Sequence, residues 1–94
     1  MLIVSGRLYV KTGAMKAFLA SSNEAVVVAR TAPGCRDFVV AADPIEVGCV
    51  NVYEEWESEE ALLNFRGSGP DSDMRSVIVR GEVFRHVISA TGPA

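Results

Sequence analysis

The stretch Asn51–Phe65, NVYEEWESEEALLNF, changes its hydrophobic period halfway along. Up to Trp56, apolar and polar residues alternate in steps of two, which is typical of a half-buried strand; after Ser58 the apolar residues recur at helical spacing. Ser58 stands where an N-cap is expected, and Glu59 and Glu60 follow in the first turn, where the helix dipole favours negative charge. A strand therefore runs almost directly into a helix.

The segments on either side of this junction complete an alternating order of strands and helices. Strands are predicted over residues 2–10, 35–42, 49–57 and 82–90. Helices are predicted over residues 14–29 and 59–66, with a further helical segment from about residue 71 or 72 that ends at Gly81. The 94 residues fit one domain. The order βαββαβ predicts an α+β, ferredoxin-like fold, in which a four-stranded antiparallel sheet carries helices on one face.

Strand parity places apolar side chains on the face of the sheet that has no helices. They are Ile3, Tyr9, Val39, Cys49, Tyr53, Val83 and Val87. Such a patch is larger than monomers usually expose, so we expect two sheets to pack face to face as a homodimeric α/β barrel. Arg7, Glu55 and Arg85 share this face by parity. We expect Glu55 to pair with an arginine, because an unpaired buried charge is costly.

Composition and residue spacing argue against several classes of function. The net charge is −3 and the basic residues are scattered, so no nucleic-acid partner is expected. No apolar run approaches the ~20 residues that span a bilayer, and the start MLIVSGRLYV lacks the features of a signal peptide. We expect a cytoplasmic protein that begins at Met1 and has no membrane partner. Cys35 and Cys49 would lie roughly 20 Å apart across a hairpin, too far for a disulfide, and no metal cluster is expected.

Three segments carry a resemblance to a known family. PGCRDFVVAADP, then VYEEWESEEAL, then a last strand make the chain similar to the antibiotic biosynthesis monooxygenase family of dimeric α/β barrels. The resemblance implies a pocket between sheet and helices that binds a small-molecule substrate, with aromatic molecules among the candidates. Family members include cofactor-independent oxygenases of aromatic phenols, haem-degrading oxygenases, and isomerases or breakdown enzymes.

The resemblance also implies which residues line this pocket. Trp56 would point into it, which places Val52 and Glu54 on the same face of their strand. Through the neighbouring first strand, Gly6 and Leu8 join them.

The sequence departs from the family pattern at several positions. Val52 stands where the quinone-forming branch has an asparagine, and Leu62 stands where it has a tyrosine. Gly6 replaces an asparagine of the haem-degrading branch, and the segment LLNFRGSG lacks that branch's histidine ligand. We therefore expect no haem and no other cofactor.

Four residues are candidates for binding or chemistry, and each has a structural alternative. Trp56 could stack on an aromatic substrate or close the core. Arg75, aligned to an arginine near substrate in the quinone-forming branch, could stabilise an anion or pair with Asp71 or Asp73. His86, which shares parity with Phe84, could act as a base towards a phenol or be structural. Glu54 could be an alternative base, with burial raising its proton affinity, or could pair with a lysine.

These residues lead to three functional hypotheses. The first is a cofactor-independent monooxygenase that oxidises an aromatic or enolisable small molecule with O₂. Catalysis would then use His86, Glu54 and Arg75, and binding would use Trp56, Val52, Gly6, Leu8 and Phe84. The second is a non-catalytic dimer that binds a small molecule. The third is a non-redox isomerase or breakdown enzyme of the same fold.

Overall fold

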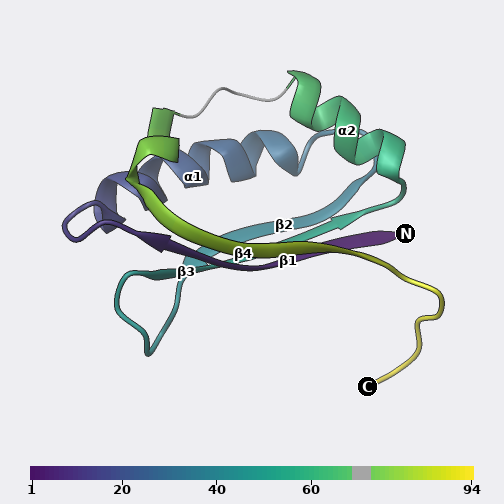
Figure 1. Ribbon diagram of the computed structural model, residues 1–94. Helices are drawn as coiled ribbons and strands as arrows, with labels where there is room; N and C mark the ends of the chain where they lie inside the picture. Colours follow the sequence, from purple (N-terminus) through teal and green to yellow (C-terminus); the bar gives the residue numbers. More distant parts are fainter. Residues whose placement is uncertain (69–72) are drawn as a thin grey trace.

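The chain forms one layer of helices on one side of a four-stranded sheet (Figure 1). The computed structural model describes residues 1–68 and 73–94. Its strands are β1 (Leu2–Val10), β2 (Cys35–Ala42), β3 (Cys49–Trp56) and β4 (Ile78–Val87), and its helices are α1 (Met15–Ala29), α2 (Glu59–Ser68) and the 3-10 helix η1 (Asp73–Val77). The strand order is β2-β3-β1-β4, and all neighbours are antiparallel. The predicted ferredoxin-like fold is confirmed.

The junction between β3 and α2 is built as its sequence indicates. The Ala61 backbone N–H donates a hydrogen bond to Ser58 Oγ at 3.1 Å, so Ser58 caps the helix. Between strand and helix, the Glu57 N–H donates to the Gly34 carbonyl at 2.8 Å, which ties the junction to the start of β2. Gly34 has a φ of 82°, a conformation that glycine adopts without steric cost. The indole of Trp56 is thereby fixed where strand and helix diverge.

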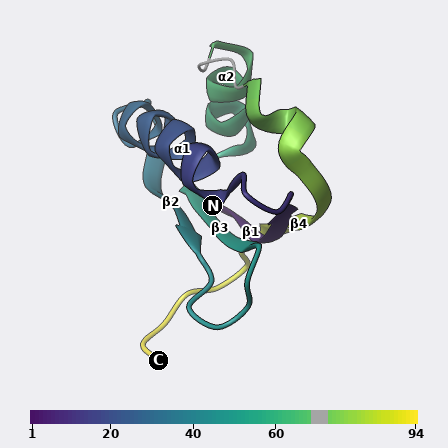
Figure 2. The ribbon, with the colours of Figure 1, turned by 90° about the vertical axis from the view of Figure 1, so that its left-hand side faces the viewer.

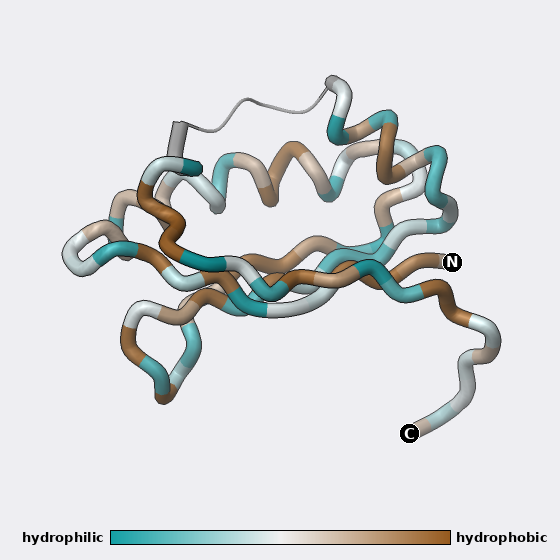
Figure 3. Tube along the Cα trace, viewed as in Figure 1, coloured by the Kyte–Doolittle hydropathy of each residue, from teal (hydrophilic) through white to brown (hydrophobic). Residues whose placement is uncertain are grey.

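The helix side of the sheet holds the core. Residues paired across antiparallel strands share a face, and the pairs Leu2↔Trp56, Val4↔Glu54 and Gly6↔Val52 all face the helices. The larger cluster of buried residues is Leu2, Val4, Val26, Ala29, Phe38, Trp56 and Leu62, and a smaller one is Val10, Phe18 and Val50. The alternation of hydrophilic and hydrophobic residues along the strands is visible in Figure 3.

The β2–β3 hairpin is closed by Asp43. Its carboxylate accepts hydrogen bonds from the backbone N–H groups of Ile45 and Glu46, and from the side-chain amide of Asn51. These bonds lower the pKa of the Asp43 carboxyl group below its usual range. The hairpin and the C-terminal tail extend from the sheet on the side away from the helices (Figure 2).

The last strand differs from its prediction in its bounds and in the face of the sheet to which its side chains point. β4 begins at Ile78 rather than at residue 82 and ends at Val87, so residues 78–81 are strand rather than helix. Its pairing with β1 joins Ile3 to His86 and Ser5 to Phe84. Phe84 and His86 therefore lie on the helix-free face, hereafter the open face.

The same register turns three other residues towards the helices. Val83, Arg85 and Val87 were predicted on the open face and lie on the helix side. Arg85 Nη1 contacts Glu59 Oε1 of α2 at 3.1 Å, as this facing requires. The prediction was wrong because β4 is a mostly exposed edge strand with apolar residues on both faces, so its sequence pattern does not specify a face.

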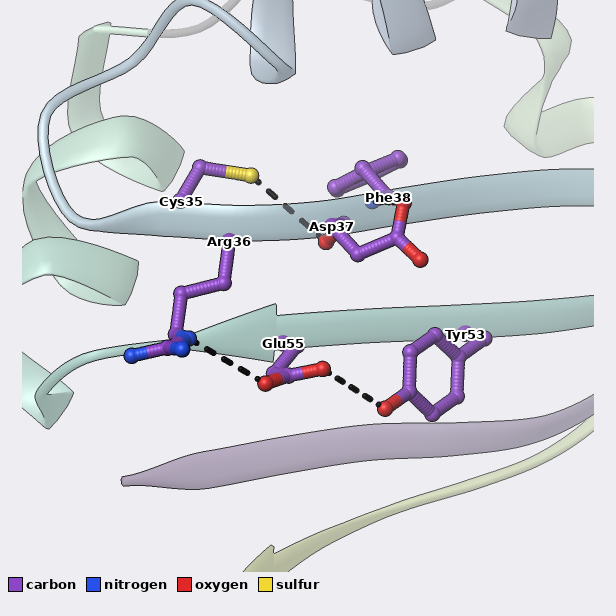
Figure 4. Close-up of polar contacts among 6 residues, drawn as sticks. All are labelled: Cys35, Arg36, Asp37, Phe38, Tyr53 and Glu55. Carbon is purple, nitrogen blue, oxygen red and sulfur yellow. Dashed lines mark hydrogen bonds and ion pairs between the residues drawn. The ribbon is translucent and has the colours of Figure 1, made fainter.

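The open face carries a connected set of polar groups (Figure 4). Arg36 Nε lies 3.3 Å from Glu55 Oε1, and the Tyr53 hydroxyl donates to Glu55 Oε2 at 3.0 Å. The β2–β3 register shifts between Cys35 and Asp37, which leaves Arg36 as an extra residue beside Glu55. Glu55 thus pairs with an arginine, as expected, but with one of its own chain.

Candidate functional site

A pocket of about 240 Å³ lies between the sheet and the helical layer. Its walls come from α1, from all four strands and from η1. The sheet contributes Leu8, Phe38, Val40, Val52, Glu54 and Ile78; α1 contributes Phe18, Ser21, Ser22 and Ala25; η1 contributes Arg75. The lining is largely apolar with a few polar groups, which is the usual character of a small-molecule site.

Glu54 is the buried ionisable group of this pocket. Its exposed fraction is 9%, and Trp56 Nε1 donates a hydrogen bond to its Oε1 at 3.0 Å. Burial raises the pKa of the Glu54 carboxyl group, while the Trp56 hydrogen bond and the nearby Arg66 charge oppose the rise. A carboxylate with raised proton affinity facing an apolar pocket has the properties of a general base.

Trp56 lies behind Glu54 and does not itself line the pocket. Its side chain is fully buried. The indole packs on Phe65 of α2 at a centroid distance of 5.3 Å, and it meets Phe38 edge-on at 6.4 Å. Its N–H is already engaged by Glu54. The predicted facing of Trp56 towards the helices is therefore correct, whereas a stacking surface for a ligand is not available in this arrangement.

Gly6 serves the sheet rather than the pocket lining. Its φ is 153°, and a Cβ at this position would collide with the carbonyl oxygen of Glu82 on β4. The absence of a side chain lets β4 approach β1 closely. A larger residue, such as the asparagine of the haem-degrading branch, does not fit here without a shift of β4. Leu8, two residues further along β1, does line the pocket, as does Val52.

Arg75 reaches the pocket from η1. Its side chain is exposed, so it lies at the mouth rather than in the interior. The alternative that Arg75 pairs with Asp71 or Asp73 concerns side chains outside the described residues. Among the described residues, Arg75 and Glu54 are thus the two charged groups that line this pocket.

Phe84 and His86 are separated from the pocket by the sheet. Both lie on the open face, and Phe84 is 65% exposed. The structure therefore does not bring His86 to Glu54 or Arg75, and the expectation that these two residues face the pocket was wrong.

Sequence reasoning missed the contribution of α1 and β2. Phe18, Ser21 and Ser22 line the pocket from α1, and Phe38 lines it from β2. A signal was present, because Ser22 falls on the apolar stripe of α1 together with Phe18. A serine on such a stripe places a hydroxyl group on the otherwise apolar, sheet-facing side of the helix.

A second and larger hollow, of about 430 Å³, lies between the end of α1 and α2. It is lined by Val28, Thr31, Ala32, Pro33, Ala61, Asn64 and Phe65. The described residues of this lining include no acidic or basic side chain, and the Thr31 hydroxyl donates a hydrogen bond to the Val28 carbonyl at 2.8 Å with no base beside it in the lining. The chemistry therefore favours the smaller pocket as the candidate site.

Within residues 1–68 and 73–94, no group of three or more His, Cys, Asp or Glu side chains is arranged to hold a metal ion. In the same part of the chain, no helix has the length and apolar character needed to cross a bilayer. Both cysteines are free thiols.

Comparison with known proteins gives a consistent family relationship. The sequence profile described as "Antibiotic biosynthesis monooxygenase" matches residues 1–75. A search of curated proteins finds no significant match.

Several solved structures share the fold. A candidate antibiotic biosynthesis monooxygenase from Nitrosomonas europaea superposes with a TM-score of 0.81 at 11% identity, covering 96% of this chain and 100% of that one. A similarly described protein from Chloroflexus aurantiacus gives 0.77 at 24% identity, covering 98% and 96%. The heme-degrader MhuD from Mycobacterium tuberculosis, solved with two hemes bound in its active site, gives 0.70 at 14% identity, covering 99% and 100%. At these identities the structural likeness concerns the fold.

Proposed function

Because the chain belongs to the antibiotic biosynthesis monooxygenase family, we propose that it oxidises an aromatic or enolisable small molecule with O₂ and without a bound cofactor. The observation that carries this proposal is the buried Glu54 carboxylate in an apolar pocket, with its pKa raised by burial. Such a group can remove a weakly acidic proton from a ligand that the pocket shields from water. With His86 on the open face, Glu54 is the base in this proposal.

The reaction needs no electron donor besides the substrate. Glu54 takes the acidic proton, and the resulting enolate or phenolate passes electron density to O₂. The O₂ unit forms a C–O bond at a carbon that carries a hydrogen, and the resulting peroxide anion takes the proton back from Glu54 to become a hydroperoxide. The hydroperoxide then loses water, together with the hydrogen of that carbon, to leave a carbonyl group. One oxygen atom stays in the product, the other leaves in water, and the substrate supplies all the electrons.

Arg75 has a separate role in this scheme. Its guanidinium at the mouth of the pocket stabilises the negative charge that develops on the substrate and on the reduced O₂ unit. On the pocket side of the guanidinium the apolar lining limits the access of water, so this interaction is screened less than one between two fully exposed charges.

The test is O₂ consumption by the purified chain with a panel of hydroxylated naphthalenes and anthracenes. Glu54→Gln should lower the rate by at least about a hundredfold, as expected for loss of a general base. His86→Gln is the matched comparison and should keep most of the rate. Equal rates for the Glu54→Gln chain and the unmodified chain would contradict the role of Glu54.

A non-redox reaction is the second candidate. Glu54 alone can move a proton between two carbon positions of an enolisable ligand, which is an isomerisation that needs no O₂. Turnover of an enolisable ketone in the absence of O₂, lost in Glu54→Gln, would favour this reading over the oxygenase.

A non-catalytic binding protein is the third candidate. Leu62 stands where the quinone-forming branch has a tyrosine, and its side chain is fully buried in the core instead of lining the pocket. Ligand binding without turnover, both in the presence and in the absence of O₂, would favour a binding protein.

The proposal also includes a homodimer formed through the open face. The Glu55 charge on that face is already matched by Arg36, and the Tyr53 hydroxyl is bonded to Glu55. A second sheet can therefore cover this part of the face without burying an unpaired charge.

A further inference from the structure

We infer that Trp56 is a positioning residue that holds Glu54 with one carboxylate oxygen free for the pocket. The pocket thereby selects a compact ligand that carries a hydrogen-bond donor at its buried end. This inference rests on the proposed function in one respect, the placement of the ligand in the Glu54 pocket, and it does not depend on the use of O₂.

The first step is that the indole cannot turn easily. The Trp56 side chain has an exposed fraction of 0%, with Phe65 tilted by 34° against its ring and Phe38 almost perpendicular to it at 88°. Closely packed aromatic groups keep one rotamer, so the direction of the Trp56 N–H is set by the core.

The second step is that this N–H fixes the carboxylate. It donates to Glu54 Oε1 at 3.0 Å, and both partners are buried. In the part of the chain that the structure describes, Glu54 Oε2 has no hydrogen-bond partner. Since Glu54 lines the pocket and Trp56 does not, Oε2 is the oxygen that remains for a ligand.

The third step concerns what such an oxygen recognises. An ionised carboxylate only accepts hydrogen bonds, whereas the hydroxyl groups of Ser21 and Ser22 in the same lining both donate and accept. Glu54 is therefore the group that discriminates. A ligand with an O–H or N–H at this end is favoured, and one that presents an ether or carbonyl oxygen leaves two acceptors facing each other.

The size of the pocket limits the ligand further. Its volume of about 240 Å³ is below the roughly 300 to 1,000 Å³ of sites for drug-sized ligands. Most of its wall is apolar, contributed by residues such as Phe18, Phe38 and Val52. A neutral, naphthol-sized molecule suits this space better than a fused tricyclic phenol, which would fill it and extend towards the mouth.

The experiment is calorimetric titration, without O₂, of the chain with naphthol, methoxynaphthalene and hydroxyanthracene. Naphthol should bind at least about tenfold more tightly than methoxynaphthalene, since a hydrogen bond to a charged group is worth that much or more. Hydroxyanthracene should bind more weakly than naphthol. Equal affinities for naphthol and methoxynaphthalene, or no binding of either, would overturn the inference on Glu54. Equal or tighter binding of hydroxyanthracene would overturn the limit on size.

Two variants separate positioning from general structure. In Glu54→Gln, the amide oxygen still accepts from Trp56, and the amide N–H group replaces the free oxygen; the preference for naphthol should vanish or invert. Replacement of Trp56 by benzothienylalanine keeps the shape of the ring and removes the N–H. The ratio of the two affinities should then fall severalfold, and the melting temperature should fall as well because the buried carboxylate loses its donor. An unchanged ratio in either variant would overturn the positioning role.

The outcome is independent of the oxygenase proposal. A preference for naphthol that depends on Glu54, together with no O₂ consumption, would support this inference and contradict the oxidation. O₂ consumption with equal affinities for naphthol and methoxynaphthalene would support the oxidation and contradict this inference.

Discussion

Trp56 Nε1 and Glu54 Oε1 lie 3.0 Å apart, and both side chains are buried on the helix side of the sheet. The hydrogen bond only partly offsets the burial of the carboxylate, because the net effect on Glu54 is a raised pKa. A group of this kind costs stability when it is ionised, and such a cost is common where a side chain serves binding or catalysis rather than folding.

Glu54→Gln should therefore make the chain more stable at neutral pH. The pKa of Glu54 is higher in the folded chain than in the unfolded chain. At pH values between these two pKa values the folded chain therefore binds more protons, so the unfolding free energy of the unmodified chain falls as pH rises through the folded-state pKa. Below the ordinary glutamate pKa of about 4.3 this loss is absent. The variant should melt a few degrees higher than the unmodified chain at neutral pH, and this difference in melting temperature should disappear as the pH is lowered.

Thermal unfolding followed by circular dichroism across this pH range is the measurement. Glu60→Gln is the matched control, because Glu60 is exposed at the start of α2 and its substitution should change the unfolding free energy by less than about 0.5 kcal/mol. A difference in melting temperature between the Glu54 variant and the unmodified chain that does not vary with pH would contradict the raised pKa of Glu54.

Leu62 and Leu63 provide a test of the core beneath α2. Leu62 is fully buried in the cluster that contains Trp56, while Leu63 is 50% exposed. Leu62→Ala should lower the unfolding free energy by about 2 to 5 kcal/mol, since it removes apolar contacts and leaves a cavity. Leu63→Ala should cost less than about 1 kcal/mol by the smaller apolar area it removes from contact. Urea unfolding of the two variants gives both values, and similar losses would show that α2 does not pack as described.

Gly6 should tolerate no side chain. In Gly6→Ala the new Cβ meets the Glu82 carbonyl, and the backbone conformation at φ 153° is unfavourable for alanine. We expect the unfolding free energy to fall by about 2 kcal/mol or more, or β4 to separate from β1. Gly67→Ala is the control, because nothing lies near its Cβ and alanine favours the helix by up to about 1 kcal/mol. Hydrogen exchange of β1 and β4 amides would locate the damage, and full protection there would count against the close approach.

The strand–helix junction was predictable from sequence because its information is local. The change of period at Trp56 and the cap at Ser58 are both set by neighbours in the chain, and both are found as expected. The face of β4 was not predictable in this way. Val83 and Val87 lie on one side and Phe84 on the other, so only the register with β1 determines which side meets the helices.

The pocket was predictable in part for the same reason. Glu54 and Val52 follow from the alternation of β3 once the buried face is known. The contribution of Ser21 depends on how α1 crosses the sheet, which is a tertiary relationship that no local pattern contains. The bond between Trp56 and Glu54 was equally hidden, because parity places the two side chains on one face without fixing their rotamers.

Phe84 on the open face offers a direct test of the proposed homodimer. Its ring is 65% exposed in the single chain, and its row of the sheet includes Ser5 and Tyr53, so a second sheet packed on this face would cover it. We expect the unmodified chain to sediment as a dimer at micromolar concentration. Phe84→Glu should shift it to the monomer, because each interface would bury two unpaired carboxylates. Val27→Glu is the control: Val27 is 67% exposed on α1, away from the open face, and its substitution should leave the dimer intact. Sedimentation of the unmodified chain as a monomer, or of the Phe84 variant as a stable dimer, would exclude assembly through this face, and the pocket would then have to function within a single chain.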